Sequence, residues 1–262
     1  MASWRDGRCS LPRNHQNRDW SLEDQDFAAS ISYMVSLSLE TSKREEAQKQ
    51  ITHSLEEKEI LLREVHHRVK NNMQIIVSLL NLQSNTIKNR EMKDIFKESQ
   101  NRVRSMSMIH EEVYQSDDLA KIDFQSYIKH FIKSLSQTYS TGLNNVGWMG
   151  DIDEVKLNIE TSIPCGLILN ELLSNSLKHA FKDGKDGKIW VKLKEEHDEI
   201  RLEVTDNGTG LPDDFQLEKT STLGLELVKN LVKQLNGKIE VKNENGTSFI
   251  ITFKELKYKA RV

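Results

Sequence analysis

Mostly hydrophobic residues recur at alternating steps of four and three between positions 51 and 79 of this 262-residue chain. This heptad spacing places them in one stripe along a helix, so we predict a long helix that packs against one or more other helices. Two polar residues interrupt the stripe. Its positions are Ile51, Leu55, Lys58, Leu62, Val65, Val69, Asn72, Ile76 and Leu79.

A second amphipathic helix is expected after a polar break at residues 87–90. Two helices joined in this way form an antiparallel hairpin, and two copies of a hairpin can combine into a four-helix bundle. The stripe therefore favours a homodimer, although packing within one chain would give the same pattern. The apolar positions of the second helix are Ile95, Val103, Met106, Ile109 and Val113.

Helices and strands alternate in the last part of the chain. The pattern predicts helices over residues 122–139 and 222–235, a strand at 146–149, and period-2 strands within 189–193, 200–204 and 239–253. Another helix has Thr161 or Ser162 as its expected cap and Pro164 in its first turn. We therefore expect an α+β chain: a helical hairpin, then an α/β sandwich whose single sheet is covered by helices on one face.

Four segments follow from these patterns: an irregular leader (1–20), a helical linker that begins at Ser21 (21–50), the hairpin (51–118) and the sandwich (119–262). A formal net charge of −3 gives no reason to expect a nucleic-acid partner. The sequence shows no apolar run of about 20 residues and no secretory signal, so we expect no membrane span and a cytoplasmic location. Cys9 and Cys165 are expected to remain thiols.

Two adjacent histidines lie on the first helix of the hairpin. The helical neighbours of His66 include apolar residues, whereas those of His67 are all polar, so His67 is expected to face the solvent. A neutral imidazole is a competent nucleophile toward phosphorus. Glu64, one turn earlier, could orient the ring or accept a proton. The same pattern is also typical of a solvated surface histidine.

A polar stripe marks the helix expected at about residues 164–181. Its members Glu171, Asn175, Lys178 and His179 are spaced by three or four residues. The amide oxygen of Asn175 suits Mg²⁺, which prefers oxygen ligands. Glu171 could polarise a water or receive a proton, and Lys178 could meet phosphate as a point charge.

Glycine-rich turns follow downstream. Asp206 ends a strand, where its carboxylate could accept a hydrogen bond from an exocyclic amine, and Gly208 and Gly210 allow close backbone approach to a ligand. The triplet Leu223, Gly224 and Leu225 opens a helix whose N-terminal amides could receive phosphate. Thr247 precedes the last strand. These residues are read from the printed sequence.

Residues 64–72, EVHHRVKNN, resemble the phosphoacceptor helix of sensor histidine kinases, and more narrowly the HWE and type-2 HisKA group, which carries His-Arg-x-Lys-Asn. This resemblance implies that His67 is the phosphoacceptor. Most other histidine kinases have an acidic residue directly after the histidine, where this chain has Arg68. We therefore favour Glu64 for assistance in proton transfer.

The downstream motifs, in their order, resemble the GHKL-type ATP-binding domain of histidine kinases, gyrase-type topoisomerases and MutL proteins. The resemblance implies that Asn175 ligates Mg²⁺, Glu171 acts as base or water orienter, and Asp206 reads adenine. It also places Lys178 and His179 near the phosphates, with Thr247 supporting the adenine contact. Gly208, Gly210 and the 223–225 triplet would shape the pocket, and the short segment 211–222 predicts a reduced lid over it.

The resemblance implies a two-component kinase that transfers phosphate from Mg-ATP to His67 and then to an aspartate of a response-regulator receiver domain. Two alternatives stay open at this point: an ATP-binding scaffold that phosphorylates nothing, and a GHKL ATPase that releases phosphate. The helix from Ser21 also resembles the last helix of a GAF sensor domain, and a plain helical leader fits it equally well.

Overall fold

The computed structural model describes residues 3–5, 8–10, 21–115, 121–139, 146–181, 187–212, 214–220 and 222–257. Its internal contacts divide the chain into two units, Met1–Lys58 and Glu59–Val262. In the first unit, strands β1 (Ser3–Arg5) and β2 (Arg8–Ser10) pair antiparallel, within the segment that we expected to be irregular.

Helix α1 (Leu22–Thr86) starts at the cap predicted from the sequence. The hydroxyl of Ser21 accepts the backbone N–H of Asp24, and the Asp24 carboxylate accepts the backbone N–H of Ser21. This reciprocal pair satisfies two donors that a helix start leaves unpaired. None of the helices in the described ranges combines the length and the apolar character needed to cross a bilayer.

Helix α2 (Arg90–Gln115) forms the predicted hairpin with the last part of α1. The break between them is capped by Asn89, whose side-chain oxygen accepts the backbone N–H groups of Glu91 and Met92. The α1 side chains that are partly or fully buried differ from most of the predicted stripe. They are Ala28, Arg63, His66, Val69, Lys70, Met73, Val77, Leu80 and Ser84.

Most of the predicted stripe stays exposed within the single chain. Leu62, Val65, Ile76 and Leu79 keep 46–55% of their surface accessible, and of the stripe's apolar members from Leu62 onward only Val69 is partly covered. The expected stripe is therefore not the seam that holds the hairpin of one chain together. Helix α2 covers a strip of α1 that lies beside the heptad stripe. The heptad stripe itself stays available for contacts with other helices.

Helix α2 is joined to the sandwich through a buried aromatic cluster. Strand β3 (Ile122–Asp123) pairs antiparallel with β5 (Lys156–Leu157), and helix α3 (Phe124–Tyr139) follows β3 directly. The hydroxyl of Tyr127 on α3 lies 2.7 Å from that of Ser105 on α2. Burial raises the pKa of Tyr127 above its usual range, which keeps the phenol neutral.

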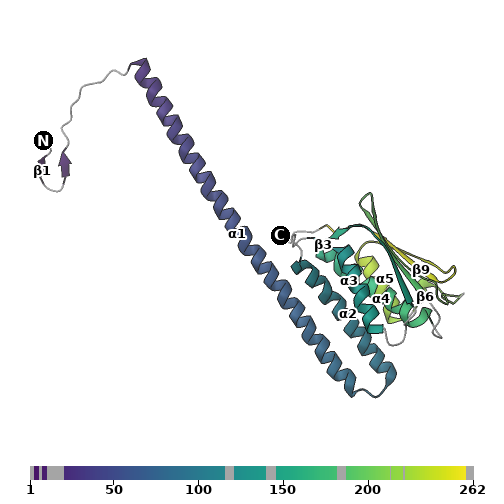
Figure 1. Cartoon of the computed structure of the whole chain (residues 1–262). Helices are drawn as coiled ribbons and strands as arrows, with labels where there is room; N and C mark the ends of the chain where they lie inside the picture. The colour runs from purple at the N-terminus through teal and green to yellow at the C-terminus, as the bar shows by residue number, and fades with distance from the viewer. Residues whose placement is uncertain are drawn as a thin grey trace. The chain divides into compact units, whose positions relative to one another are not determined.

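Five strands form the sheet in the order β4-β6-β7-β9-β8. Only β4 and β6 are parallel, and every other neighbouring pair is antiparallel. Helices α4 and α5 lie on one face of this sheet, as predicted (Figure 1). The strands are β4 (Val146–Ile152), β6 (Gly187–Glu196), β7 (Glu199–Asp206), β8 (Lys238–Lys242) and β9 (Thr247–Phe253).

Helix α4 (Ile159–Asn175) begins earlier than expected, because its cap is Asn158. The predicted caps, Thr161 and Ser162, lie inside the helix. The Asn158 side chain accepts the backbone N–H of Thr161 at 2.9 Å and donates to the carbonyl of Leu256. A contact with a residue distant in sequence thus selects among three cap-type residues, which local pattern alone cannot do.

The helix continues past Asn175 as a π-helical turn, Ser176–Ala180. Such wide turns occur often at functional sites. Helix α5 (Leu223–Gln234) ends where the sequence predicted, since Asn236 adopts a left-handed backbone conformation (φ 52°) just before Gly237. Within the segment expected to form a lid, the described residues include a short 3-10 turn, Leu217–Lys219. The predicted boundary near residue 118 lies outside the described residues.

Candidate nucleotide site and phosphoacceptor histidine

A cavity of about 650 Å³ opens where α4, its π-helical turn, the end of β7 and the start of α5 meet. The structure brings nearly all the predicted nucleotide-binding residues into its wall. Gly208 does not line it but lies beside Asp206, to which it donates its backbone N–H. The predicted residues that line the cavity are Glu171, Asn175, Lys178, His179, Asp206, Gly210, Leu223, Gly224, Leu225 and Thr247.

Asp206 is held rigidly in the wall of the cavity and is only 4% exposed. One carboxylate oxygen accepts the hydroxyl of Ser176 at 2.8 Å. The other accepts the backbone N–H groups of Gly208 and Thr247 at 3.0 and 3.4 Å. An ionised carboxylate offers about four acceptor positions, so this one retains capacity for a further donor such as an exocyclic amine.

Two glycines permit the close packing of this region. A Cβ at Gly224 would lie 2.8 Å from a carboxylate oxygen of Glu171, so a side chain there would force that carboxylate or the start of α5 to shift. Gly246 has φ +122°, and a Cβ there would lie 2.0 Å from the carbonyl oxygen of Asp206. The residue before Thr247 must therefore be glycine.

The residues that line the cavity are compatible with the binding of Mg²⁺. Among the described residues, no group of three or more His, Cys, Asp or Glu side chains could hold a metal ion by itself. Mg²⁺ commonly keeps several waters and binds through one or two protein oxygens together with substrate phosphates. The half-buried amide of Asn175 in the cavity wall offers one such oxygen.

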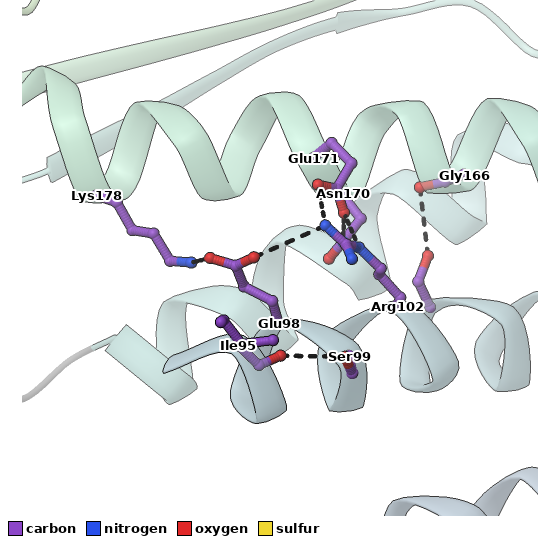
Figure 2. Close-up of polar contacts among 9 residues, drawn as sticks. Ile95, Glu98, Ser99, Arg102, Gly166, Asn170, Glu171 and Lys178 are labelled. Atoms are coloured by element: carbon purple, nitrogen blue, oxygen red, sulfur yellow. Dashed lines mark hydrogen bonds and ion pairs between the residues drawn. The ribbon is translucent and has the colours of Figure 1, made fainter. Parts of the chain in front are cut away.

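Helix α2 also reaches the cavity, through Glu98 and Asn101. Glu98 receives the ammonium group of Lys178 at 2.5 Å. Arg102 donates to both carboxylate oxygens of Glu171, at 2.7 and 2.9 Å (Figure 2). Two polar groups that we predicted to handle phosphate and protons are thus paired with side chains of the hairpin.

The sequence argument missed several of these residues. Ser176, which orients Asp206, and Asn170, which donates to Glu171 at 3.0 Å, carry no motif signal of their own. Arg102 had a usable signal, because it lies three residues before the buried Ser105 and seven before the buried Ile109. A charged residue on the buried stripe of an amphipathic helix indicates a polar partner across the interface.

His67 is exposed, as predicted. Its ring centroid lies 6.0 Å from that of Tyr114 on α2, and its Nδ1 atom lies 3.5 Å from the side-chain amide of Asn71. Glu64, which we expected to orient the ring, instead accepts the guanidinium of Arg68 at 2.6 Å. The structure therefore does not bring Glu64 and His67 together.

His66 lies at the seam, as its helix position indicated. Its Nδ1 atom lies 3.0 Å from that of His110 on α2. Burial lowers the pKa of both rings, and the neighbouring His66 lowers that of His110 further. One ring must donate and the other accept, so the pair requires at least one neutral imidazole.

The histidine and the cavity are well separated along α2. His67 packs beside Tyr114, whereas the nearest cavity-lining residue of α2, Asn101, lies thirteen residues earlier on the same helix. At 1.5 Å per residue this is about 20 Å of helix axis. Direct contact between a nucleotide in this cavity and His67 of the same chain therefore requires a rearrangement.

Family profiles match both parts of the described site. The profile described as "Histidine kinase" (HisKA_2) matches residues 64–139, and the profile described as "Histidine kinase-, DNA gyrase B-, and HSP90-like ATPase" matches residues 161–257. The chain belongs to the histidine kinases. The first match extends through α3, which our predicted boundary assigns to the ATP-binding segment, so that boundary stays a prediction.

Two curated relatives are themselves named histidine kinases. Sensor histidine kinase PdtaS of Mycobacterium tuberculosis (strain ATCC 25618 / H37Rv) is 30% identical over 202 residues, which are 74% of this chain and 39% of the relative. Blue-light-activated histidine kinase 2 of Erythrobacter litoralis (strain HTCC2594) is 26% identical over 88% of this chain and 64% of the relative. The chain thus spans less than two thirds of the length of either relative.

A solved structure supports the fold of the described histidine-kinase region. The histidine kinase domain of the Erythrobacter litoralis EL346 blue-light activated histidine kinase has a TM-score of 0.57 and 27% sequence identity. The match covers 74% of this chain and 90% of that one. The helical region followed by an α/β ATPase domain, expected from the sequence, is confirmed.

Proposed function

We propose that this chain is an ATP-dependent protein histidine kinase in which His67 accepts the γ-phosphoryl group and then donates it to an aspartate of a response-regulator receiver domain. One observation carries the proposal. The imidazole of His67 is exposed on the hairpin, and the second helix of the same hairpin reaches a cavity lined by Asp206, Asn175 and Lys178. Both family profiles and the related kinases support the same reaction.

In the proposed reaction, a neutral ring nitrogen of His67 attacks the terminal phosphorus of ATP. A nitrogen–phosphorus bond forms, the bond to the bridging oxygen breaks, and ADP leaves. The ring proton passes to a base or to water. Positioning and charge neutralisation dominate such a transfer. When bound, Mg²⁺ would neutralise charge on the phosphate oxygens, and Asn175 would be its ligand in the protein.

Adenine recognition is assigned to Asp206, supported by its spare acceptor capacity and by the apolar side chains around it. Leu211, Phe215 and Phe249 line the same cavity. Such walls suit an aromatic base, with one polar group to fix its orientation. Lys178 and His179 would meet the phosphates. Glu64 and Glu171 are both paired with arginines, Arg68 and Arg102, so either carboxylate must leave its arginine before it can accept the proton, and water is the alternative acceptor.

A homodimer is the proposed assembly. Apolar side chains of the hairpin remain exposed in the single chain, at 46–66% of their surface, on positions that a four-helix bundle would cover. Isolated exposed apolar residues are ordinary, but a contiguous set marks an interface. The residues are Leu61, Leu62, Val65, Ile75, Ile76, Leu79, Leu82, Met92 and Ile95.

Incubation of the purified chain with γ-³²P-ATP and Mg²⁺ tests the proposal. His67→Gln should abolish acid-labile labelling, whereas His66→Gln, at the adjacent position, should retain most of it. Equal loss in both variants would contradict the choice between the two histidines. Release of free phosphate without any labelled protein would instead identify a GHKL ATPase.

A further inference from the structure

Two side chains of α2 occupy the polar groups of the nucleotide cavity. The Glu98 carboxylate accepts the Lys178 ammonium at 2.5 Å and lies 3.7 Å from the Arg102 guanidinium. Arg102 clamps the Glu171 carboxylate with two hydrogen bonds, at 2.7 and 2.9 Å. The four charged side chains thus form one chain of contacts, from Lys178 to Glu98 and Arg102 on α2 and on to Glu171 on α4 (Figure 2). We call Glu98 and Arg102 the α2 clamp.

Glu98 lies in the position expected of an anionic ligand. It lines the cavity and pairs with the lysine that would otherwise meet a phosphate oxygen. A carboxylate and a phosphate oxygen offer lysine the same kind of charge-assisted hydrogen bond and repel each other, so they compete for its ammonium group. Glu98 is about one third exposed, and such a pair is weak enough for a polyanion to displace.

Arg102 lies deeper and holds a different group. The side chains of Arg102 and Glu171 are 15% and 7% exposed, and both carboxylate oxygens are occupied. This two-bond pairing fixes the orientation of the Glu171 carboxylate and engages both of its oxygens while the arginine stays in place. Removing either partner of such a buried pair would leave an uncompensated charge, so this contact opens only if α2 moves.

The clamp also leaves polar groups unsatisfied at the cavity wall. The side-chain nitrogen of Asn101 on α2 and the side-chain oxygen of Asn170 on α4 are buried and make no hydrogen bond to any described residue. Both residues line the cavity. Unpaired buried groups favour an alternative state in which they gain partners, a phosphate oxygen or water for the Asn101 nitrogen and a water for the Asn170 oxygen.

We propose that the α2 clamp holds the kinase in a resting state, in which Glu98 competes with the nucleotide phosphates for Lys178 and Arg102 keeps Glu171 from acting. The proposal rests on the proposed function, because it requires a nucleotide in the cavity. Displacement of Glu98 by phosphate would remove one of the contacts that hold α2 against α4. Loosening of α2 is a step toward the rearrangement that transfer to His67 requires within one chain, because His67 lies on α1 beside Tyr114, about 20 Å along α2 from the cavity.

Binding of adenosine, ADP and ATP to the whole 262-residue chain tests the competition, by calorimetry with Mg²⁺ present. Glu98→Gln should lower the Kd for ADP and ATP about two- to five-fold, the range expected for removing one screened ion pair. It should leave the Kd for adenosine unchanged, because adenosine carries no phosphate. Glu91→Gln provides the matched control: it makes the same charge change on an exposed part of α2 and should change none of the three constants.

Hydrogen exchange provides a second readout that does not depend on a variant. Mg-ATP should accelerate exchange of the α2 amides near residues 98–102 in the unmodified chain, and adenosine should not. Unchanged or weaker ATP binding by Glu98→Gln, or an equal gain for adenosine, would overturn the clamp while His67 labelling leaves the kinase proposal standing. Absence of nucleotide binding in the unmodified chain would overturn both.

Discussion

At the scale of single residues, the cavity depends on an absent side chain. Gly224 lets the first turn of α5 approach the Glu171 carboxylate, and a methyl group there would lie within 2.8 Å of it. The approach also brings the N-terminal backbone amides of α5, which can bind anions, to the wall of the cavity. The sequence suggested a pocket-shaping glycine here, but only the coordinates identify which side chain it must avoid.

Gly224→Ala should weaken ATP binding about tenfold while the chain stays folded. The added methyl must displace Glu171 or shift α5, and overpacking of this kind typically costs 1–3 kcal/mol. Calorimetric titration with Mg-ATP measures the effect. Gly147→Ala is the matched control, because its Cβ would meet neighbours at 3.8 Å, which is ordinary contact. Similar losses in both variants would show that the effect is not specific to the cavity.

The paired rings of His66 and His110 predict a pH response of the hairpin. Burial lowers the pKa of both below the ordinary 6.5, so the unfolded chain binds protons more readily than the folded one. The stabilising contribution is complete above about pH 6.5 and is lost as the pH falls toward the lowered values.

Thermal unfolding between pH 7.5 and 5.5 measures this response, and the melting temperature should fall on acidification. His110→Gln should reduce the fall, because it removes one titrating ring of the pair. His53→Gln, at an exposed position on α1, should leave the pH dependence as it is. An identical slope in the unmodified chain and in His110→Gln would contradict the assignment.

At the scale of helices and strands, periodicity predicted most of what the structure contains. The helix ends at Ser21, residues 87–90 and Asn236-Gly237 were correct because local caps and breaks decide them. The start of α4 was wrong because Asn158 also binds Leu256, nearly a hundred residues away. The sequence did not predict the α2 clamp for the same reason, because the partners of Glu98 and Arg102 are distant in sequence and come close only in the folded chain.

Asn158→Ala should therefore lower the free energy of unfolding by about 1–2 kcal/mol, toward the upper end of the range for lost caps. The substitution removes the hydrogen bond to the first turn of α4 and leaves the Leu256 carbonyl without this donor. Urea unfolding of the whole chain provides the measurement. Asn230→Ala, on the exposed side of α5, should cost little. A loss below a few tenths of a kcal/mol for Asn158→Ala would contradict the cap assignment.

At the scale of the whole molecule, the heptad stripe and the separation of the two reactive groups point to the same assembly. The stripe was predicted as a packing seam, yet most of it is exposed in one chain. Covering it requires another helical surface of the same periodicity, which a second copy of the hairpin supplies. In such a dimer, the cavity of one chain gains a second histidine helix as a possible acceptor, besides its own.

Leu79→Lys should convert the dimer into a monomer at micromolar concentration. The side chain is 55% exposed in the single chain, so the substitution spares the internal core, whereas a lysine in a bundle seam would be buried without a partner. Sedimentation analysis measures the mass, and Glu57→Lys, at an exposed position on α1, serves as the control.

Mixing the His67→Gln and Asn175→Ala chains then separates the two routes of phosphate transfer, within one chain and between chains. If phosphate passes between chains, the mixture regains labelling on the Asn175→Ala chain, and Leu79→Lys in both chains abolishes that recovery. A monomeric unmodified chain that labels itself at full rate would leave only the in-chain route, which must then open the contact between α2 and α4.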